Sequence, residues 1–159
     1  ALLSAEITEK IKAIVSRALN SLGIQYGASH SEIKITTDGT IRIIEIGGRM
    51  GGDFIGSSLV EISTGFDYLK AVIDIALDIE PEVRVSPGPH AAVRFIFNQN
   101  DLNALRTMKR EHPEIIVDYA INNTLTPLEV TDSSNRYGYF IFSSSDRSLI
   151  EEYLPNTEA

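Results

Sequence analysis

Two glutamates and an arginine in the segment 27–52 are the residues best suited to chemistry. Glu32 and Glu45 lie on either side of Asp38-Gly39, a dipeptide that is flanked by β-branched runs and is typical of a two-residue hairpin turn. Such a turn pairs residues whose numbers sum to 77, so that Glu32 faces Glu45. Because directly opposed like charges repel each other, the sequence predicts a divalent cation between the two carboxylates.

The same turn predicts the other pairs of the hairpin. Thr37 then faces Thr40, and Lys34 faces Ile43. One face of the hairpin carries a polar cluster together with two isoleucines: His30, Glu32, Lys34, Ile41, Ile43, Glu45 and Gly47. The opposite face is aliphatic and is predicted to face the core: Ile33, Ile35, Ile44 and Ile46.

A glycine-rich loop, Gly47-Gly-Arg-Met-Gly-Gly, follows the second carboxylate directly. Glycines allow backbone N–H groups to approach a ligand closely, and Arg49 adds a planar donor for phosphate or carboxylate. Mg²⁺ prefers carboxylate oxygens and keeps positions for water and phosphate. Two carboxylates followed by an arginine in a glycine loop are therefore the equipment expected for phosphoryl transfer.

Each of these residues also has a purely structural interpretation, which the sequence leaves open. A glutamate pair on a hairpin is commonly solvated surface, and Arg49 can pair with a neighbouring carboxylate. The glycine loop can be a tight reversal of the chain. His30 can be a hydrogen-bonded structural histidine, and Asp53 and Asp67 can be helix caps.

Hydrophobic spacing predicts the elements that position this segment. An amphipathic helix is expected over 4–22, capped by Ser4 and ended by Gly23, and strands are expected near 28–36 and 40–46. Helices over 54–62 and 68–78 follow, capped by Asp53 and Asp67. The second of these helices is apolar around most of its circumference and is expected to be deeply buried.

The rest of the chain is predicted to form a second lobe. The connector near 80–89 is rich in helix breakers, which divides the chain into domains 1–88 and 89–159. Strands are expected near 91–97, 114–122, 127–131 and 137–143, and helices near 101–111 and after Asp146. The predicted fold class is α+β, a largely antiparallel sheet with flanking helices.

Composition narrows the classes of function. The chain has 159 residues and a net charge of −8 with no basic cluster, which argues against a nucleic-acid partner. Its apolar runs are short, so no membrane span is predicted. The absence of cysteine excludes disulfides, zinc–thiolate sites and cysteine nucleophiles, and it agrees with a cytoplasmic location.

The combined motifs resemble the C-terminal half of the ATP-grasp fold, and the amino-acid ligase and carboxylase-like branches are the most similar. The resemblance is carried by three runs: Gly27-x-x-His30-x-Glu32, Ile44-Glu45-Ile-Gly-Gly-Arg49-x-Gly-Gly and Thr64-Gly-x-Asp67. It covers residues 4–80, and it extends more weakly to 89–159 as the small α/β lobe that follows the catalytic core in such enzymes.

This resemblance implies an ATP-dependent carboxylate–amine ligase. In that family a substrate carboxylate attacks the γ-phosphate of ATP, and an amine then displaces phosphate from the acyl-phosphate. The metal- and nucleotide-binding carboxylates, which hold Mg²⁺ or Mn²⁺, fall on Glu32 and Glu45. The catalytic, phosphate-binding arginine falls on Arg49. The candidates for contact with the substrate, a small carboxylic acid or amino acid, are His30, Gly51, Gly52 and Asp53.

Two departures from the family pattern shape the prediction. Gly47 stands where many members have a metal-binding asparagine, and the N-terminal lobes that hold the nucleotide have no counterpart here. We therefore expect a fragment of a larger enzyme that is inactive alone. The alternative is a stand-alone, non-catalytic ligand-binding or subunit module with the same half-fold. For residues 89–159, shielding of the acyl-phosphate and a homodimer surface both stay open.

Overall fold

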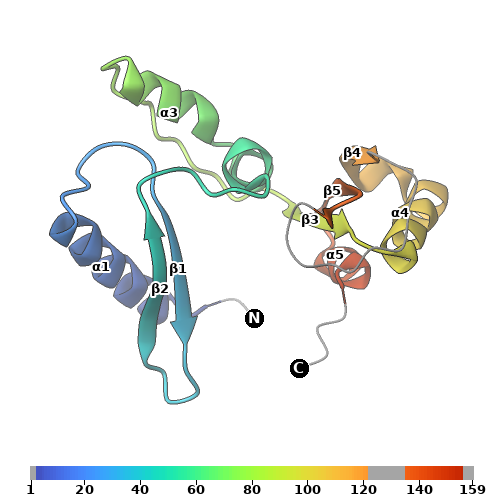
Figure 1. Ribbon diagram of the computed structural model, residues 1–159, viewed down its shortest axis with the longest axis horizontal. Helices are drawn as coiled ribbons and strands as arrows, with labels where there is room; N and C mark the ends of the chain where they lie inside the picture. The colour runs from blue at the N-terminus through green and yellow to red at the C-terminus, as the bar shows by residue number, and fades with distance from the viewer. Residues whose placement is uncertain (1–2, 122–134, 156–159) are drawn as a thin grey trace. The chain divides into compact units, whose positions relative to one another are not determined.

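The computed structural model describes residues 3–121 and 135–155 (Figure 1). The chain forms two compact units, the first made of residues 1–56 and 68–82 and the second of 57–67 and 83–159. Antiparallel strands and flanking helices occur in both units. The predicted α+β class is therefore confirmed.

The first unit begins with the predicted helix. Helix α1 spans Ala5–Ser21, and the Ser4 side chain accepts a hydrogen bond from the N–H of Ile7 at 3.3 Å. The helix ends where Gly23 adopts a positive φ of 71°, a conformation that glycine reaches without a steric penalty. The start and the stop signals read from the sequence are both confirmed.

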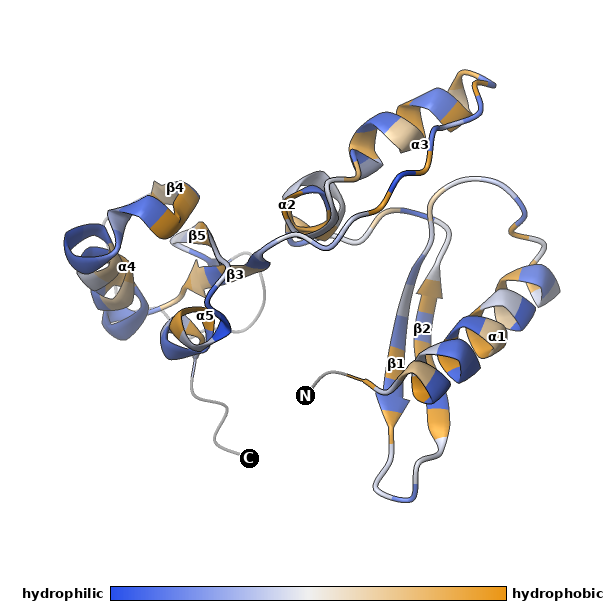
Figure 2. Ribbon diagram, turned by 180° about the vertical axis from the view of Figure 1, so that it is seen from behind, coloured by the Kyte–Doolittle hydropathy of each residue, from blue (hydrophilic) through white to orange (hydrophobic). Residues whose placement is uncertain are grey.

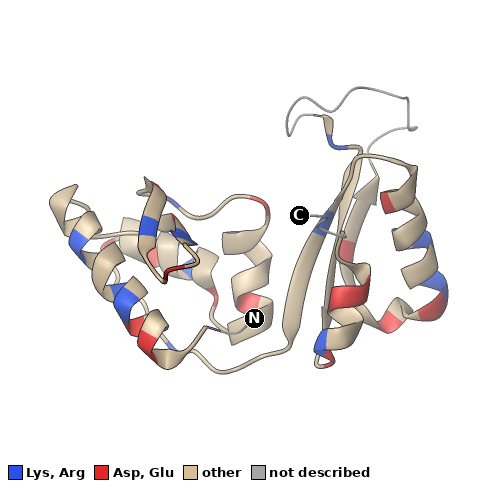
Figure 3. Cartoon of the chain, turned by 90° about the horizontal axis from the view of Figure 1, so that it is seen from below, with Lys and Arg blue, Asp and Glu red and all other residues tan. Residues whose placement is uncertain are grey.

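Helix α1 has no fully buried residue, and charged side chains lie along its surface. Acidic and basic residues occur together on the helices (Figure 3), and α1 carries the exposed ion pairs Lys10–Glu6 and Lys12–Glu9. Such exposed pairs are screened by solvent and contribute little to stability. The helix packs on strand β2 (Ile41–Gly47). None of the described helices is long and apolar enough to cross a lipid bilayer.

Strands β1 (His30–Ile35) and β2 form the hairpin, but its turn differs from the prediction. The N–H of Thr36 donates to the carbonyl of Thr40, and that of Gly39 donates to the carbonyl of Thr36, both at 2.9 Å. The loop therefore has three residues rather than two, with Gly39 at a φ of 81°. The Asp38 carboxylate accepts a hydrogen bond from the Thr36 hydroxyl and another from the N–H of Thr40. Both bonds lower the pKa of that carboxyl, and the bond from Thr36 has the larger effect.

A β-bulge in β2 compensates for the longer loop. From the loop to Ile33 the register is shifted by one residue from the predicted one, so that Lys34 faces Arg42. The register then changes between Ile33 and Glu32, with Ile44 as the extra residue on β2. Beyond the bulge Glu32 faces Glu45. The carboxylate pair is thus confirmed, whereas the predicted pairs of Lys34 with Ile43 and Thr37 with Thr40 are wrong.

The bulge also sorts the side chains of the hairpin by polarity. Ile33 faces Ile43 and Ile35 faces Ile41, so these four isoleucines share one face and are not mixed with the polar cluster. Both strands carry hydrophilic and hydrophobic residues in Figure 2. The predicted neighbourhood of Ile41 and Ile43 with the glutamates is therefore wrong, because the prediction contained no bulge.

The chain after the glycine loop does not form the predicted helix over 54–62. Asp53 and Phe54 have positive φ values of 52° and 62°, which differ from the extended backbone of an N-cap residue. A single π-helical turn, Ile55–Leu59, follows and leads into α2, Val60–Thr64. Asp53 therefore does not cap a helix at residue 54. Gly65, at a φ of 67°, ends α2.

Helix α3 spans Tyr68–Ala76, and its predicted deep burial is wrong. Only Ala71 and Asp74 are buried within it. Leu69 and Ile73 are 43% and 51% exposed, and Leu77, just beyond the helix, is 65% exposed. These three residues recur at four-residue spacing, and the described part of the chain leaves the stripe that they form uncovered.

The second unit contains most of the buried core. Besides α2, its elements are β3 (His90–Ile96), α4 (Gln99–Glu111), a 3₁₀ turn (Pro113–Ile115), β4 (Ile116–Ile121), β5 (Gly138–Ser144) and α5 (Arg147–Tyr153). The strands form an antiparallel sheet in the order β3-β5-β4. Asn98 and Asp146 cap the two helices. The predicted strand over 127–131 lies outside the described residues.

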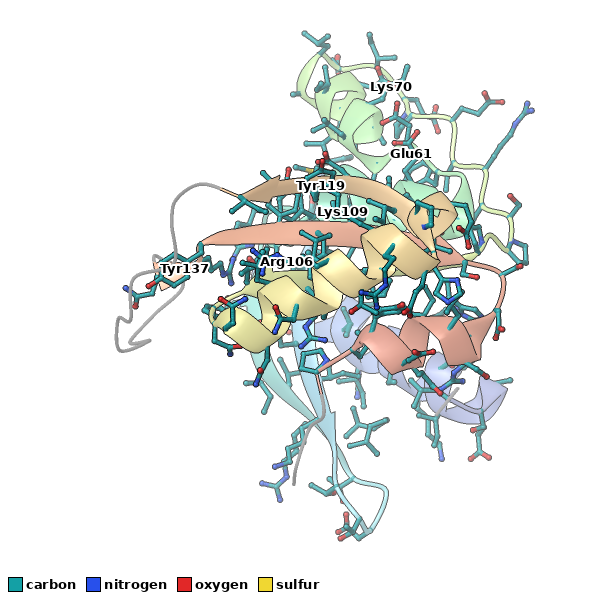
Figure 4. All side chains as sticks on the ribbon, turned by 90° about the vertical axis from the view of Figure 1, so that its right-hand side faces the viewer. Glu61, Lys70, Arg106, Lys109, Tyr119 and Tyr137 are labelled. Carbon is teal, nitrogen blue, oxygen red and sulfur yellow. The ribbon has the colours of Figure 1, made fainter. Side chains whose placement is uncertain are left out.

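The core of the second unit lies between the sheet and the helices α4 and α5. Its fully buried members include Phe140 and Phe142, whose rings stack at 5.5 Å. At its edge Lys109 of α4 lies over the ring of Tyr119 of β4, 3.8 Å from its centroid (Figure 4). The inner face of α4 carries three buried hydrophobic residues: Leu102, Leu105 and Met108.

A buried ion pair joins three elements of this unit. Arg94 of β3 donates from Nε and Nη2 to Asp101 of α4 at 3.1 and 2.8 Å, and from Nη1 to the carbonyl of Tyr153 in α5 at 2.8 Å. The second carboxylate oxygen of Asp101 accepts the N–H of Phe97 at 3.0 Å. The network fixes the positions of α4 and α5 on the sheet.

Candidate metal and phosphate site

The two glutamates lie opposite each other on neighbouring strands. Glu32 of β1 and Glu45 of β2 are register partners, and opposed residues in such a ladder have Cβ atoms about 4.5–5.5 Å apart. Their side chains are 56% and 57% exposed. The carboxylates can therefore reach one common ion from solvent without any change in the backbone.

Arg49 lies next to this pair. One end of its guanidinium, Nη2, is 3.9 Å from Oε1 of Glu45, and Nη1 donates to the carbonyl of Met50 at 2.7 Å. The Arg49 side chain is 60% exposed, so its remaining donors face solvent. A guanidinium that is held loosely beside a carboxylate keeps donors with which it can bind a phosphate.

His30 lies next to Glu32, and its register partner on β2 is Gly47. Its Nε2 atom is 3.6 Å from Oε1 of Glu32, beyond the usual hydrogen-bond distance. The imidazole is only 23% exposed. A Cβ placed on Gly51 would lie 2.9 Å from Nδ1 of His30. The structure thus brings His30, Gly51 and Glu32 together.

The remaining candidates, Gly52 and Asp53, follow in the same loop and are exposed. A Cβ on Gly52 would meet nothing within 4 Å, so the backbone there is open to a ligand. The positive φ of Asp53 turns the chain away from the strand direction. These two residues extend the loop beyond the carboxylate pair.

The residues that attach the glycine loop to other elements were not predicted from the sequence. The hydroxyl of Tyr68 donates to the carbonyl of Ser29 at 3.4 Å, across 39 positions of sequence. A Cβ on Gly56 would lie 3.0 Å from Cβ of Met50 and 3.3 Å from Cδ1 of Tyr68. No spacing in the sequence signals these contacts, because each joins separate elements.

The donor set fits Mg²⁺ or Mn²⁺. No group of three or more His, Asp or Glu side chains that could hold a metal occurs within residues 3–121 and 135–155. Mg²⁺ is commonly bound by one or two carboxylates together with phosphates and water, whereas a structural zinc site needs four protein ligands. The Glu32/Glu45 pair therefore suits a magnesium ion that is shared with a phosphate ligand.

Comparison with known proteins was made by sequence and by structure. No protein-family model matches the chain, and the search of curated protein sequences found no match either. Among solved structures, an L-amino acid ligase from Bacillus licheniformis matches 96% of this chain with a TM-score of 0.78 and 24% identity. The chain has the ATP-grasp fold.

Other ATP-grasp enzymes match over a similar range. A phosphoribosylglycinamide synthetase from Anaerococcus prevotii covers 96% of this chain with a TM-score of 0.74 and 20% identity. The biotin carboxylase domain of the Hydrogenobacter thermophilus 2-oxoglutarate carboxylase, in complex with MgADP, covers 90% with a TM-score of 0.55 and 17% identity. This chain spans 41%, 40% and 33% of these three structures. The predicted resemblance is confirmed at the level of the fold.

Proposed function

We propose that the chain carries one half of the active site of an ATP-dependent carboxylate–amine ligase. In this proposal Glu32 and Glu45 bind Mg²⁺, and Arg49 binds the phosphate that is transferred. The observation that carries it is the direct opposition of the two glutamates across the hairpin. Support comes from the ATP-grasp fold and from the MgADP that is bound in one structural neighbour.

The chemistry follows from the charges of these residues. A bound Mg²⁺ would neutralise part of the charge on the phosphates of ATP. The two glutamates hold that ion, and the guanidinium of Arg49 compensates the charge on the transferred phosphate. The substrate carboxylate attacks the γ-phosphorus, ADP leaves, and an amine then displaces phosphate to form the amide. The substrate is a small carboxylic acid or an amino acid, contacted by the loop 51–53.

The proposal assigns residues 1–88 to the catalytic core and 89–159 to a small C-terminal lobe. A nucleotide-binding lobe supplies the adenine pocket and further phosphate ligands, so this chain by itself does not turn over ATP. The whole enzyme acts in the cytoplasm. The C-terminal lobe either shields the acyl-phosphate from water or forms a dimer surface.

Mn²⁺ titration of the ¹⁵N-labelled chain tests the metal site, because Mn²⁺ broadens the resonances of nearby nuclei. We expect selective broadening at Glu32, Glu45 and their neighbours. Glu32→Gln or Glu45→Gln removes one of two ligands and should weaken Mn²⁺ binding by about tenfold or more. Excess Mg²⁺ should reverse the broadening.

The matched control is Glu9→Gln, which removes an exposed carboxylate from α1 and should leave Mn²⁺ binding unchanged. Glu32→Gln also relieves repulsion between opposed carboxylates, so the melting temperature of the metal-free chain should stay the same or rise. Broadening that is centred elsewhere, or that survives both glutamine substitutions, would disprove the metal site.

Gly47 favours the second candidate function, a ligand-binding module without catalysis, because glycine offers no third metal ligand. Both candidates predict Mn²⁺ at the glutamate pair. Only the ligase predicts that Arg49→Ala abolishes ATP-dependent amide formation when the chain acts together with its nucleotide lobe. Amide formation at an unchanged rate in that variant would favour the module.

A further inference from the structure

The imidazole of His30 lies between the carboxylate pair and the glycine loop. One of its edges, Nε2, lies 3.6 Å from the Glu32 carboxylate. At the other edge, Nδ1 lies 2.9 Å from the place that a Cβ on Gly51 would occupy. The ring is 23% exposed, against 56% for the side chain of Glu32. His30 is therefore packed against the loop backbone and is not presented to solvent.

Gly51 is enclosed from two directions at this point. A Cβ on Gly51 would also lie 3.1 Å from Cβ and Cγ2 of Ile55. The neighbouring Gly52 has open space at the same position. Close packing of this kind tolerates no added methyl group without displacement of its neighbours. Gly51, two residues beyond Arg49, is thus the point where the loop is held.

The other side of the loop is attached to the same end of β1. Met50 and Tyr68 both lie against Gly56, and the Tyr68 hydroxyl donates to the carbonyl of Ser29. Ser29 directly precedes His30. The start of β1 therefore supports the loop at two points, one through the His30 ring and one through the Ser29 carbonyl.

We propose that His30 is a positioning residue, which packs against Gly51 and fixes the glycine loop so that Arg49 lies beside Glu45. It holds the loop and binds neither the metal nor the substrate. The consequence for phosphate binding rests on the proposed function. The packing itself does not, and it can be tested in the metal-free chain.

The first test compares two adjacent alanine substitutions. Gly51→Ala should lower the melting temperature by about 3–10 °C, as overpacking of a close contact does. It should also shift the backbone amide and the Nε–H resonances of Arg49. Gly52→Ala makes the same chemical change where there is room, so it should leave the melting temperature within about 2 °C and the Arg49 resonances in place.

The second test repeats Gly51→Ala in a His30→Ala background. Removal of the imidazole relieves the 2.9 Å contact and leaves the 3.1 Å contacts with Cβ and Cγ2 of Ile55. The effect of Gly51→Ala on the Arg49 resonances should therefore fall to less than half. Strictly additive effects would overturn the proposal, because they would show that the ring and the loop are not coupled.

A conservative variant separates positioning from general stability. His30→Asn places an amide near the former Nδ1, so it should return the Arg49 resonances toward those of the wild type, whereas His30→Ala should not. Failure of this rescue would overturn the proposal. If the His30 and Gly51 substitutions are coupled but the wild-type chain shows no Mn²⁺ broadening at the glutamates, only the proposed function is contradicted.

Discussion

Replacing Asp101 with asparagine is expected to lower the free energy of unfolding of the second unit by about 3–5 kcal/mol. Asparagine keeps an oxygen for the N–H of Phe97 but no longer neutralises Arg94. The Arg94 and Asp101 side chains are 12% and 10% exposed, so the guanidinium would remain charged and almost without water. Urea denaturation of the full chain, followed by circular dichroism, measures the change.

Two further variants isolate the cause of this loss. Asp146→Asn makes the same change at the N-cap of α5, where asparagine is an equally good cap, and it should cost less than about 0.5 kcal/mol. Adding Arg94→Met to Asp101→Asn removes the unpaired charge and should recover at least half of the lost stability. If Asp101→Asn costs no more than Asp146→Asn, the buried pair does not stabilise the unit.

The inner face of α4 could be predicted from sequence, but the ion pair could not. Leu102, Leu105 and Met108 recur at helical spacing, and that period fixes which side of a helix meets a core. Asp101 lies beside this face and would ordinarily be placed in solvent. Its burial depends on Arg94 from a different element, and no local period encodes a contact of that kind.

The predicted opposition of Glu32 and Glu45 is correct, although the loop and the register of the hairpin both differ from the prediction. Asp38-Gly39 was correctly placed in the turn, but a dipeptide does not distinguish a two-residue loop from a three-residue loop. The bulge at Ile44 was not predictable either, because a run of β-branched residues reads alike in both registers. The two errors cancel beyond Ile33, so the opposition of Glu32 and Glu45 agrees with the structure.

The candidate site also has parts that the sequence predicts and parts that it does not. Residue types and order indicated the carboxylates and Arg49, because that chemistry requires those types at close sequence spacing. The support of the loop was not predictable, since His30 meets Gly51, and Tyr68 meets Ser29, only after folding. The predicted deep burial of α3 is wrong for a related reason. An apolar circumference shows that a helix needs covering, but it does not show that the described chain supplies the cover.

Gly138→Ala is expected to cost at least about 3 kcal/mol, above the usual range for an added methyl group in a core. Gly138 begins β5 between Ile96 of β3 and Ile121 of β4. A Cβ there would lie 2.1 Å from the carbonyl oxygen of Ala120 and 3.0 Å from Cα of Ile121. Both are backbone atoms, so no side-chain rotation relieves the clash and the strands must separate.

The separation of β4 from β5 can be observed directly by hydrogen exchange. Amides of β4 should lose protection in Gly138→Ala, while those of β3, on the other side of β5, keep more of theirs. Gly52→Ala, which adds the same methyl group in open space, controls for the reduced entropy of the unfolded chain and should leave the stability nearly unchanged. Protection in β4 that equals the wild-type value would show that the strand tolerates the added methyl group. The close approach at Gly138 would then be no constraint on the residue at that position.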